Sequence, residues 1–544
     1  LITASATTTV TSRDNIAILG RFITTGAGFV SKDAIGTMMP VESALRAFAA
    51  GSALGGLTGK TWTNSVTVTT TAGLTPTAYW AAAKAGTAPS SVASVVTGTI
   101  NSAELSIDPV IAKANAANMD LSAVTGAYNY AGAGVVQAFR DATGNLTGFY
   151  HKTSSVPFVY LAPTTSNGKT IIFQHGITGQ KEQVVAVASS LTGAGYAVVA
   201  IDLPLHGALA VPTHTTGSVW GQDFMAVGAP LATRSNIQQA AFNLNRLELT
   251  LKTGGFIAAG VTTALPTEIK FASISLGSIV GAYYLAGNTT LSTTGYPYTQ
   301  TTLNSDMKGF LSVPGGRTAY LIQNSPSFSP SVNAGLAAMG VATGSPTYHN
   351  FFQVTQSVVD PADPATLTTP LATGLPSRLS GRIAIQEAVG DTVIPNENTR
   401  YLGSALGGRE VLGTAGASVA PGFKQLGYRG AATPRIPSTF LYTLTSGAPS
   451  AKVDFAAKGG IGATTPAEGY FQFDQTGINH GSLLDPTASL ANTGYMQSQM
   501  VQYLLYGGIV DSTPSGVTRP AYDAQIPAMK YDVSLPPVLK ILGY

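Results

Sequence analysis

Three residues have the side chains, and the order along the chain, that nucleophilic catalysis requires. Ser275 comes first, Asp391 second and His480 third. A serine hydroxyl becomes a useful nucleophile only when a base removes its proton and an acid orients that base. We interpret Ser275 as the nucleophile, Asp391 as the orienting acid and His480 as the base, a set suited to acyl transfer.

The sequence around Ser275 predicts a strand, a sharp turn and a helix in succession. Apolar residues precede Ser273-Ile274-Ser275-Leu276-Gly277, and further apolar residues recur at helical spacing after it. In such a nucleophile elbow the strained serine needs small neighbours two positions before and after it. Ser273 and Gly277 are small, although the usual pattern has glycine at both places. Taken alone, an ordinary strand-to-helix turn with hydroxyls capping the helix explains this stretch equally well.

Asp391 and His480 each follow a predicted strand. Asp391 lies just past the apolar stretch 382–388, and His480 lies past 471–473. In open α/β sheets, active groups gather at the carboxyl ends of the strands. The order serine, acid, histidine is that of the α/β-hydrolases.

The acid has alternatives within the same region. Glu387 lies inside the predicted strand, and Asp360 and Asp363 lie in the stretch 359–364. Asp391 is favoured because it lies in a turn at the strand's end. Among the six histidines, His175 and His206 also follow strands, but both precede Ser275, where this fold has oxyanion and lid loops.

An oxyanion hole requires two backbone N–H groups that face the developing negative charge. Leu276, directly after the nucleophile, should supply one, and Ile177 in the loop after His175-Gly176 should supply the other. A plain turn at a strand end is the alternative for that loop. His175 and Ile274 are also expected to lie at the substrate pocket, Ile274 at its floor.

The alternation of short strands and helices from residue 146 onwards predicts a mostly parallel sheet with helices on both faces. We expect a catalytic domain over 146–544, with a long Gly/Ala/Pro-rich insertion at 396–465. Residues 1–145 form an N-terminal region whose fold the sequence leaves open.

The loop 204–232 is rich in glycine, proline and apolar side chains, including Trp220 and Phe224. We expect it to form an apolar wall or lid over Ser275 that contacts a hydrophobic substrate. The alternative is that it packs on the sheet without contacting substrate.

Composition narrows the choice of function. Charged residues make up 10% of the 544 residues, the net charge is +3, and cysteine is absent. No long Lys/Arg run supports nucleic-acid binding, and thiolate zinc sites and disulfides are excluded. No H-E-x-x-H motif occurs, and we expect neither metal nor cofactor. An S-x-x-K match at 305–308 lacks the companion motifs of penicillin-recognising enzymes.

Several blocks in order along residues 150–510 resemble the bacterial extracellular lipases called virulence-factor lipases. The resemblance implies an α/β-hydrolase fold and hydrolysis of carboxylic esters, including lipids, with Ser275, Asp391 and His480 at the triad positions. It also implies secretion from, or display on the outer surface of, a Gram-negative bacterium. Members of this family usually have Gly-His-Ser-Leu-Gly at the elbow, which differs here, and 1–145 match poorly. The similar blocks are 172–178, 198–207, 275–281, 356–364, 386–391 and 480–485.

The leading hypothesis is therefore a secreted serine hydrolase of hydrophobic esters that makes transient contact with a lipid or polymer surface. A lysophospholipase or a polyester hydrolase is the alternative among enzymes. A non-catalytic binding protein on the same fold is the alternative of another class. Leu1 is not a natural start, which suggests that an upstream segment has been removed.

Overall fold

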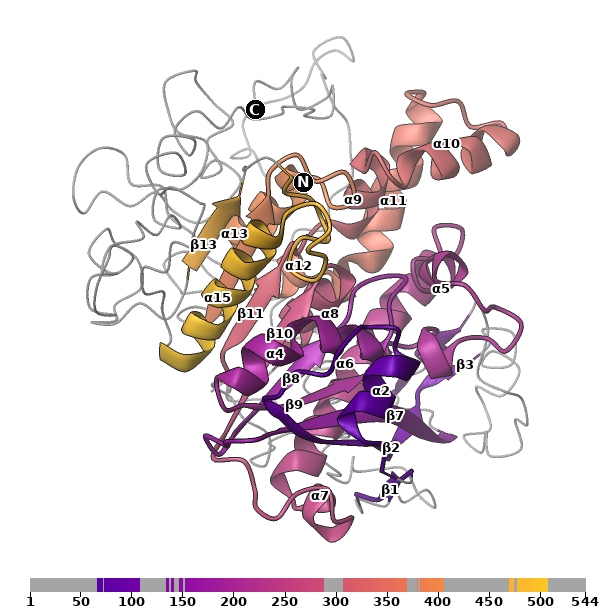
Figure 1. Cartoon of the computed structure of the whole chain (residues 1–544). Helices are drawn as coiled ribbons and strands as arrows, with labels where there is room; N and C mark the ends of the chain where they lie inside the picture. Colours follow the sequence, from indigo (N-terminus) through magenta and orange to yellow (C-terminus); the bar gives the residue numbers. More distant parts are fainter. Residues whose placement is uncertain are drawn as a thin grey trace, which may run out of the picture.

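In the computed structural model, a single mixed sheet runs through the molecule (Figure 1). The structure describes residues 66–71, 73–107, 134–136, 138–140, 146–149, 152–287, 307–368, 379, 382–405, 469–473 and 477–506. In the described chain the sheet has nine strands. Their spatial order is β1 (Val68–Thr70), β2 (Val92–Glu104), β7 (Lys152–Pro163), β9 (Ala197–Ile201), β8 (Lys169–Gln174), β10 (Glu268–Ile274), β11 (Gly309–Ser312), β12 (Ile383–Ala388) and β13 (Gly469–Phe473).

The strands from β9 to β13 in this order run parallel, whereas β1, β2 and β7 pair antiparallel at one edge. The chain crosses over between β8 and β9, so that β8 lies beside β10. A parallel sheet with an antiparallel edge, and a serine at a strand-to-helix turn at its centre, is the α/β-hydrolase fold. The predicted fold class is confirmed.

Helices cover both faces of the sheet, as the alternating pattern predicts (Figure 1). On one face α4 (Val185–Gly193) packs beside α15 (Leu490–Tyr506), and on the other α6 (Pro230–Lys252) packs beside α8 (Leu276–Gly287). The parallel strands read as continuous apolar runs because both faces are buried. Every residue of β9 is buried, and so are all residues of α8 up to Ala286.

The remaining described elements are helices, 3₁₀ turns and two small ladders. The helices are α2 (Pro76–Ala82), α5 (Gly217–Phe224), α7 (Gly255–Ala258), α9 (Thr318–Asn324), α10 (Ser329–Ala338), α11 (Pro346–Val359), α12 (Pro364–Thr368) and α13 (Asn396–Ala405). Three 3₁₀ turns are η2 (Lys181–Val184), η3 (Gly207–Leu209) and η4 (Asp360–Ala362), and two short ladders pair β3 (Ser106–Ile107) with β4 (Val135–Val136) and β5 (Ala138–Arg140) with β6 (Leu146–Phe149).

The structure joins strands from both sides of the predicted boundary at residue 145. β2 pairs with β7 along almost its whole length, from Val92 opposite Pro163 to Glu104 opposite Lys152. The described part of the N-terminal region therefore extends the main sheet. Residues 1–65 of the N-terminal region lie outside the described residues, as do residues 406–465 of the predicted insertion.

Candidate active site

The turn between β10 and α8 holds Ser275 in a strained conformation. Its φ is +57°, in the left-handed region that residues with a Cβ rarely adopt. A Cβ built on Gly277 would lie 2.4 Å from the His175 carbonyl oxygen and 2.5 Å from that of Gln174. Only glycine fits at position 277, which explains why the second small residue of the elbow is required.

Serine replaces the first glycine of the usual elbow without loss of packing. The Ser273 hydroxyl lies 2.9 Å from the Ser278 hydroxyl, which in turn donates to the Ser312 carbonyl oxygen at 2.9 Å. Both hydroxyls are buried and both find partners. Ser273 therefore ties the strand to the first turn of α8, a contact that glycine could not make.

The three residues inferred from sequence order lie in one hydrogen-bonded line. His480 Nε2 is 2.7 Å from Ser275 Oγ, and His480 Nδ1 is 2.6 Å from Asp391 Oδ2. Asp391 and Ser275 are buried, while the His480 side chain is 17% exposed. A carboxylate on Nδ1 fixes the tautomer in which Nε2 accepts a proton, so the arrangement can activate a serine hydroxyl.

Backbone groups hold the Asp391 carboxylate in place. Its Oδ1 accepts hydrogen bonds from the N–H groups of Val393 at 2.7 Å and Ile394 at 3.0 Å. The turn after β12 thus folds back onto its own aspartate and leaves Oδ2 for His480.

The alternative acids are engaged elsewhere. Glu387 accepts from Arg400 Nε at 3.1 Å, deep in the core. Asp363 accepts from the N–H groups of Arg317 and Thr318. Burial raises the pKa of Asp360 to about 6, and its carboxylate accepts from the Gln356 amide.

The loop after β8 lies directly against the nucleophile. A Cβ built on Gly176 would lie 2.9 Å from Ser275 Cβ. The Gly176 N–H donates to the Gln183 side chain at 3.3 Å, which leaves Ile177 as the next backbone donor in the loop. Leu276 is the first residue of α8, directly after Ser275. Of the two residues predicted for the oxyanion hole, Leu276 thus follows Ser275 directly, and Ile177 follows the glycine that lies against it.

His175 fastens this loop and is not a substrate contact. It is fully buried, its Nε2 accepts the Leu203 N–H at 2.9 Å, and its Nδ1–H donates to the Gly176 carbonyl at 2.8 Å. Both ring nitrogens are thus used, and burial lowers the pKa of His175 to about 4. The prediction that His175 lies at the substrate pocket is wrong, because the ring has no accessible atom.

Ile274 and Phe224 also lie in the core. Ile274 is 3% exposed and Phe224 is fully buried, with its ring 5.6 Å from that of His206. Phe224 has no exposed surface and cannot form an accessible wall, so this predicted substrate contact is corrected. Ile274 retains about as much exposed surface as Ser275, and its place at the pocket floor stays a prediction. Trp220 is partly exposed, and its indole N–H donates to the His214 carbonyl at 2.6 Å.

The predicted lid loop contains a short helix, α5. It packs on the loop 175–179 after β8, which we call the oxyanion loop because it carries Ile177. A Cβ built on Gly217 would lie 2.3 Å from the Thr178 carbonyl oxygen, and one on Gly221 would lie 2.9 Å from Ile177 Cγ1. The two glycines lie four residues apart, on one helix face. Their spacing was the signal in the sequence that α5 approaches another backbone, and the sequence reasoning missed it.

A buried ion pair beneath the loop was also missed. Asp202, just after β9, is fully buried and accepts from Lys181 Nζ at 3.1 Å and from the Ala208 N–H at 3.1 Å. It links the segment after Gly179 to the segment after β9. The position of an aspartate directly after an apolar strand is the one signal that could have singled it out.

Neither a metal site nor a membrane span is found in the described parts of the chain. No group of three or more His, Asp or Glu side chains there is arranged to hold a metal ion. No helix among these residues is both long and apolar enough to cross a bilayer.

No protein-family model and no curated protein matches the chain. Solved structures that it resembles include an acylaminoacyl peptidase of Pyrococcus horikoshii, with 12% identity, a TM-score of 0.33 and coverage of 68% of this chain and 42% of the peptidase. An acetyl xylan esterase of Paenibacillus sp. R4 shares 10% identity, with a TM-score of 0.32 and coverage of 69% and 86%. A lipase/esterase of Lactobacillus plantarum shares 13%, with a TM-score of 0.27 and coverage of 49% and 82%. These likenesses are too weak to bear on substrate, and the assignment to the α/β-hydrolase fold rests on the strand order and the elbow.

Proposed function

We propose that this protein is a serine hydrolase of carboxylic esters. The observation that carries the proposal is the continuous line from Ser275 Oγ through His480 to Asp391 Oδ2, with contacts of 2.7 and 2.6 Å. A strained serine at the apex of a strand-to-helix turn, in contact with an oriented imidazole, is arranged for attack on a carbonyl.

In the first half of the proposed reaction, Ser275 Oγ forms a bond to the carbonyl carbon while its proton passes to His480 Nε2. The N–H groups of Leu276 and Ile177 stabilise the negative oxygen that results. Collapse of this intermediate breaks the bond to the alcohol oxygen, which takes the proton from His480. An acyl group is left on Ser275.

The second half repeats these steps with water as the nucleophile. His480 removes a proton from water, the hydroxide attacks the acyl carbon, and Ser275 leaves with the proton returned by His480. The carboxylate of Asp391 stabilises the imidazolium in each half and is not itself protonated. The products are a carboxylic acid and an alcohol.

A fluorophosphonate probe tests the nucleophile directly, because it forms a stable bond only with an activated serine. We expect labelling of the native protein and none of Ser275→Ala, with peptide mass mapping placing the adduct on Ser275. The Ser273→Ala variant is the matched control and should still react. Equal labelling of native protein and Ser275→Ala would place the activated serine elsewhere, and no labelling of either would point to a binding protein.

We further propose that the substrates are hydrophobic esters and that the protein acts outside the cell or on its surface. The chain's low charge content and the partly exposed Trp220 beside the oxyanion loop favour an apolar substrate. Rates on p-nitrophenyl esters of increasing chain length, an emulsified lipid, a lysophospholipid and a polyester film would separate lipase, lysophospholipase and polyesterase activity.

Trp220 offers a specific test of this preference. Trp220→Ala should raise KM for a long-chain ester by more than for the acetate ester, because only the longer chain reaches the indole. Phe224→Ala, in the buried core, is expected to lower stability without this selectivity. An equal effect of Trp220→Ala on both substrates would remove the indole from the substrate-binding surface.

A further inference from the structure

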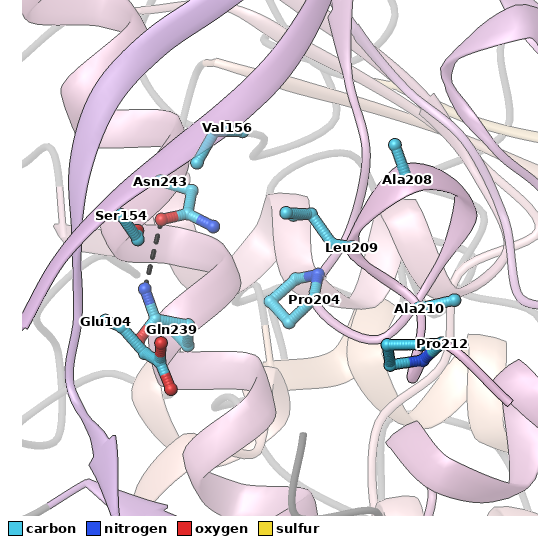
Figure 2. A pocket seen from close by; sticks show the side chains of 10 residues that line it. All are labelled: Glu104, Ser154, Val156, Pro204, Ala208, Leu209, Ala210, Pro212, Gln239 and Asn243. Carbon is cyan, nitrogen blue, oxygen red and sulfur yellow. Dashed lines mark hydrogen bonds between the residues drawn. The ribbon is translucent and has the colours of Figure 1, made fainter. Parts of the chain in front are cut away.

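A cavity of about 250 Å³ lies between α6 and the loop that follows β9. Figure 2 shows its two unlike walls. One wall is polar and comes from Glu104 at the end of β2, Ser154 of β7, and Gln239 and Asn243 of α6. None of the five residues placed in the hydrolytic machinery lines it, so the cavity is separate from the candidate active site.

The polar wall presents a hydrogen-bond donor whose orientation is fixed. The Leu105 N–H donates to Gln239 Oε1 at 2.7 Å, which identifies the other end of that amide as the nitrogen. Gln239 Nε2 then donates to Asn243 Oδ1 at 3.0 Å, and the Ser102 hydroxyl donates to the same oxygen at 2.9 Å. Asn243 Nδ2 is therefore the end of the amide that points into the cavity (Figure 2).

This amide nitrogen is an unused donor on a buried residue. Asn243 is 3% exposed, and among the residues that the structure describes none accepts a hydrogen bond from its Nδ2. The nitrogen is open to the cavity, where it can donate to a bound molecule. The Glu104 side chain, 8% exposed, brings a carboxylate with several acceptor positions to the same wall.

The opposite wall is apolar. It consists of Pro204, Leu209, Ala210 and Pro212, while Val156 of β7 lies on the side of Asn243 (Figure 2). A ligand that satisfies both walls must accept a hydrogen bond, donate one, and carry a short aliphatic part. A hydroxyl is the smallest group that both donates and accepts. The cavity is smaller than the 300–1,000 Å³ typical of drug-sized sites, which limits the ligand to a compact molecule.

We propose that this cavity is a second, non-catalytic site for a compact aliphatic alcohol. The hydroxyl accepts from Asn243 Nδ2 and donates to the Glu104 carboxylate, while the alkyl chain contacts Leu209 and the prolines. The inference does not depend on hydrolysis, although an alcohol is also a product class of the proposed reaction. The bound alcohol would contact the 204–212 segment. His206 of this segment and Leu203, just before it, neighbour His175 of the oxyanion loop.

Ligand-observed NMR titration of the full chain with butan-1-ol tests this site. The Ser275→Ala background is used throughout, so that no acyl chemistry intervenes. We expect saturable binding that is lost in Ala210→Phe, which fills the cavity, and retained in Ala337→Phe, the same change on the exposed face of α10. Equal binding by both variants would place the alcohol elsewhere and overturn the proposal.

Two further measurements keep the test decisive if Ala210→Phe folds poorly. The isomeric ether 1-methoxypropane cannot donate a hydrogen bond and should bind about tenfold more weakly than butan-1-ol. Leu209→Ala removes side-chain atoms from the apolar wall and enlarges the cavity, so the preferred ligand should shift from butan-1-ol towards hexan-1-ol. An ether that binds as well as the alcohol would show that the hydroxyl is not recognised, and no saturable binding at all would show that the cavity holds only water. Either result would overturn the proposal.

Discussion

At the scale of single residues, the site depends on how Asp391 is held. Two backbone N–H groups fix one oxygen and His480 takes the other, so the carboxylate has one orientation. Glu387, four residues earlier, is equally buried but neutralised by Arg400. The difference in role between the two carboxylates thus follows from what surrounds them.

Asp391→Asn should lower kcat/KM by about ten thousand-fold, because an amide on Nδ1 favours the wrong tautomer of His480. Ester hydrolysis at saturating and limiting substrate measures the effect. Asp360→Asn is the matched control and should retain most activity, because Asp360 contacts Gln356 and not His480. The assignment fails if the control loses activity and Asp391→Asn does not.

The order of Ser275, Asp391 and His480 along the chain was enough to predict which three residues meet. Each follows an apolar strand, and parallel neighbouring strands bring their carboxyl ends to one edge. The same reasoning misplaced His175, because a residue type and a strand end do not reveal burial. His175 Nδ1 donates to the carbonyl of its neighbour Gly176, but Nε2 accepts from the N–H of Leu203, 28 residues away, which no local pattern reports.

At the scale of elements, α5 and the oxyanion loop form a close backbone contact. The sequence of 204–232 showed apolar and glycine residues but not which side of the helix would meet Ile177 and Thr178. Thr178 has a φ of +63°, so the loop is itself held in an unfavourable conformation. The oxyanion loop packs against the glycine face of α5, and this contact helps to hold Thr178 in its left-handed conformation.

Gly217→Ala should therefore lower kcat by on the order of 10²-fold with little change in KM, since a small displacement of an oxyanion donor has that cost. The new methyl group would collide with the Thr178 carbonyl oxygen and push the loop that carries Ile177. Gly228→Ala is the control, because a Cβ there meets nothing within 4 Å. A KM effect without a kcat effect would instead place α5 in substrate binding.

At the scale of the whole molecule, the antiparallel edge is part of the catalytic sheet. The sequence leaves the fold of 1–145 open, because small and hydroxyl residues dominate strands such as β2. Hydrogen bonding to β7 stabilises β2 as a strand although its own composition does not predict one. β-propensity is strongly context-dependent, so such a strand is recognised only through its pairing.

Two buried histidines link the stability of the whole molecule to pH. Burial lowers the pKa of His175 to about 4 and that of His206 to about 3, where the neighbouring His175 adds to the effect. The His206 Nδ1–H donates to the Pro204 carbonyl, and its buried Nε2 finds no partner among the described residues. Unfolding releases both rings to solvent, where they titrate near pH 6.5.

Below pH 6.5 both histidines therefore bind protons in the unfolded chain but stay neutral in the folded protein. The free energy of unfolding consequently falls as the pH falls. Each histidine should contribute a slope of up to about 1.4 kcal/mol per pH unit between pH 6.5 and its folded pKa. His206→Asn keeps a donor near the Nδ1 position but cannot be protonated, so it should reduce this slope. Urea unfolding at pH 7.5, 6 and 5 measures the slope of each variant. His349→Asn, on the exposed face of helix α11, is the control. If His206→Asn and His349→Asn change the slope equally, then the buried rings are not its source.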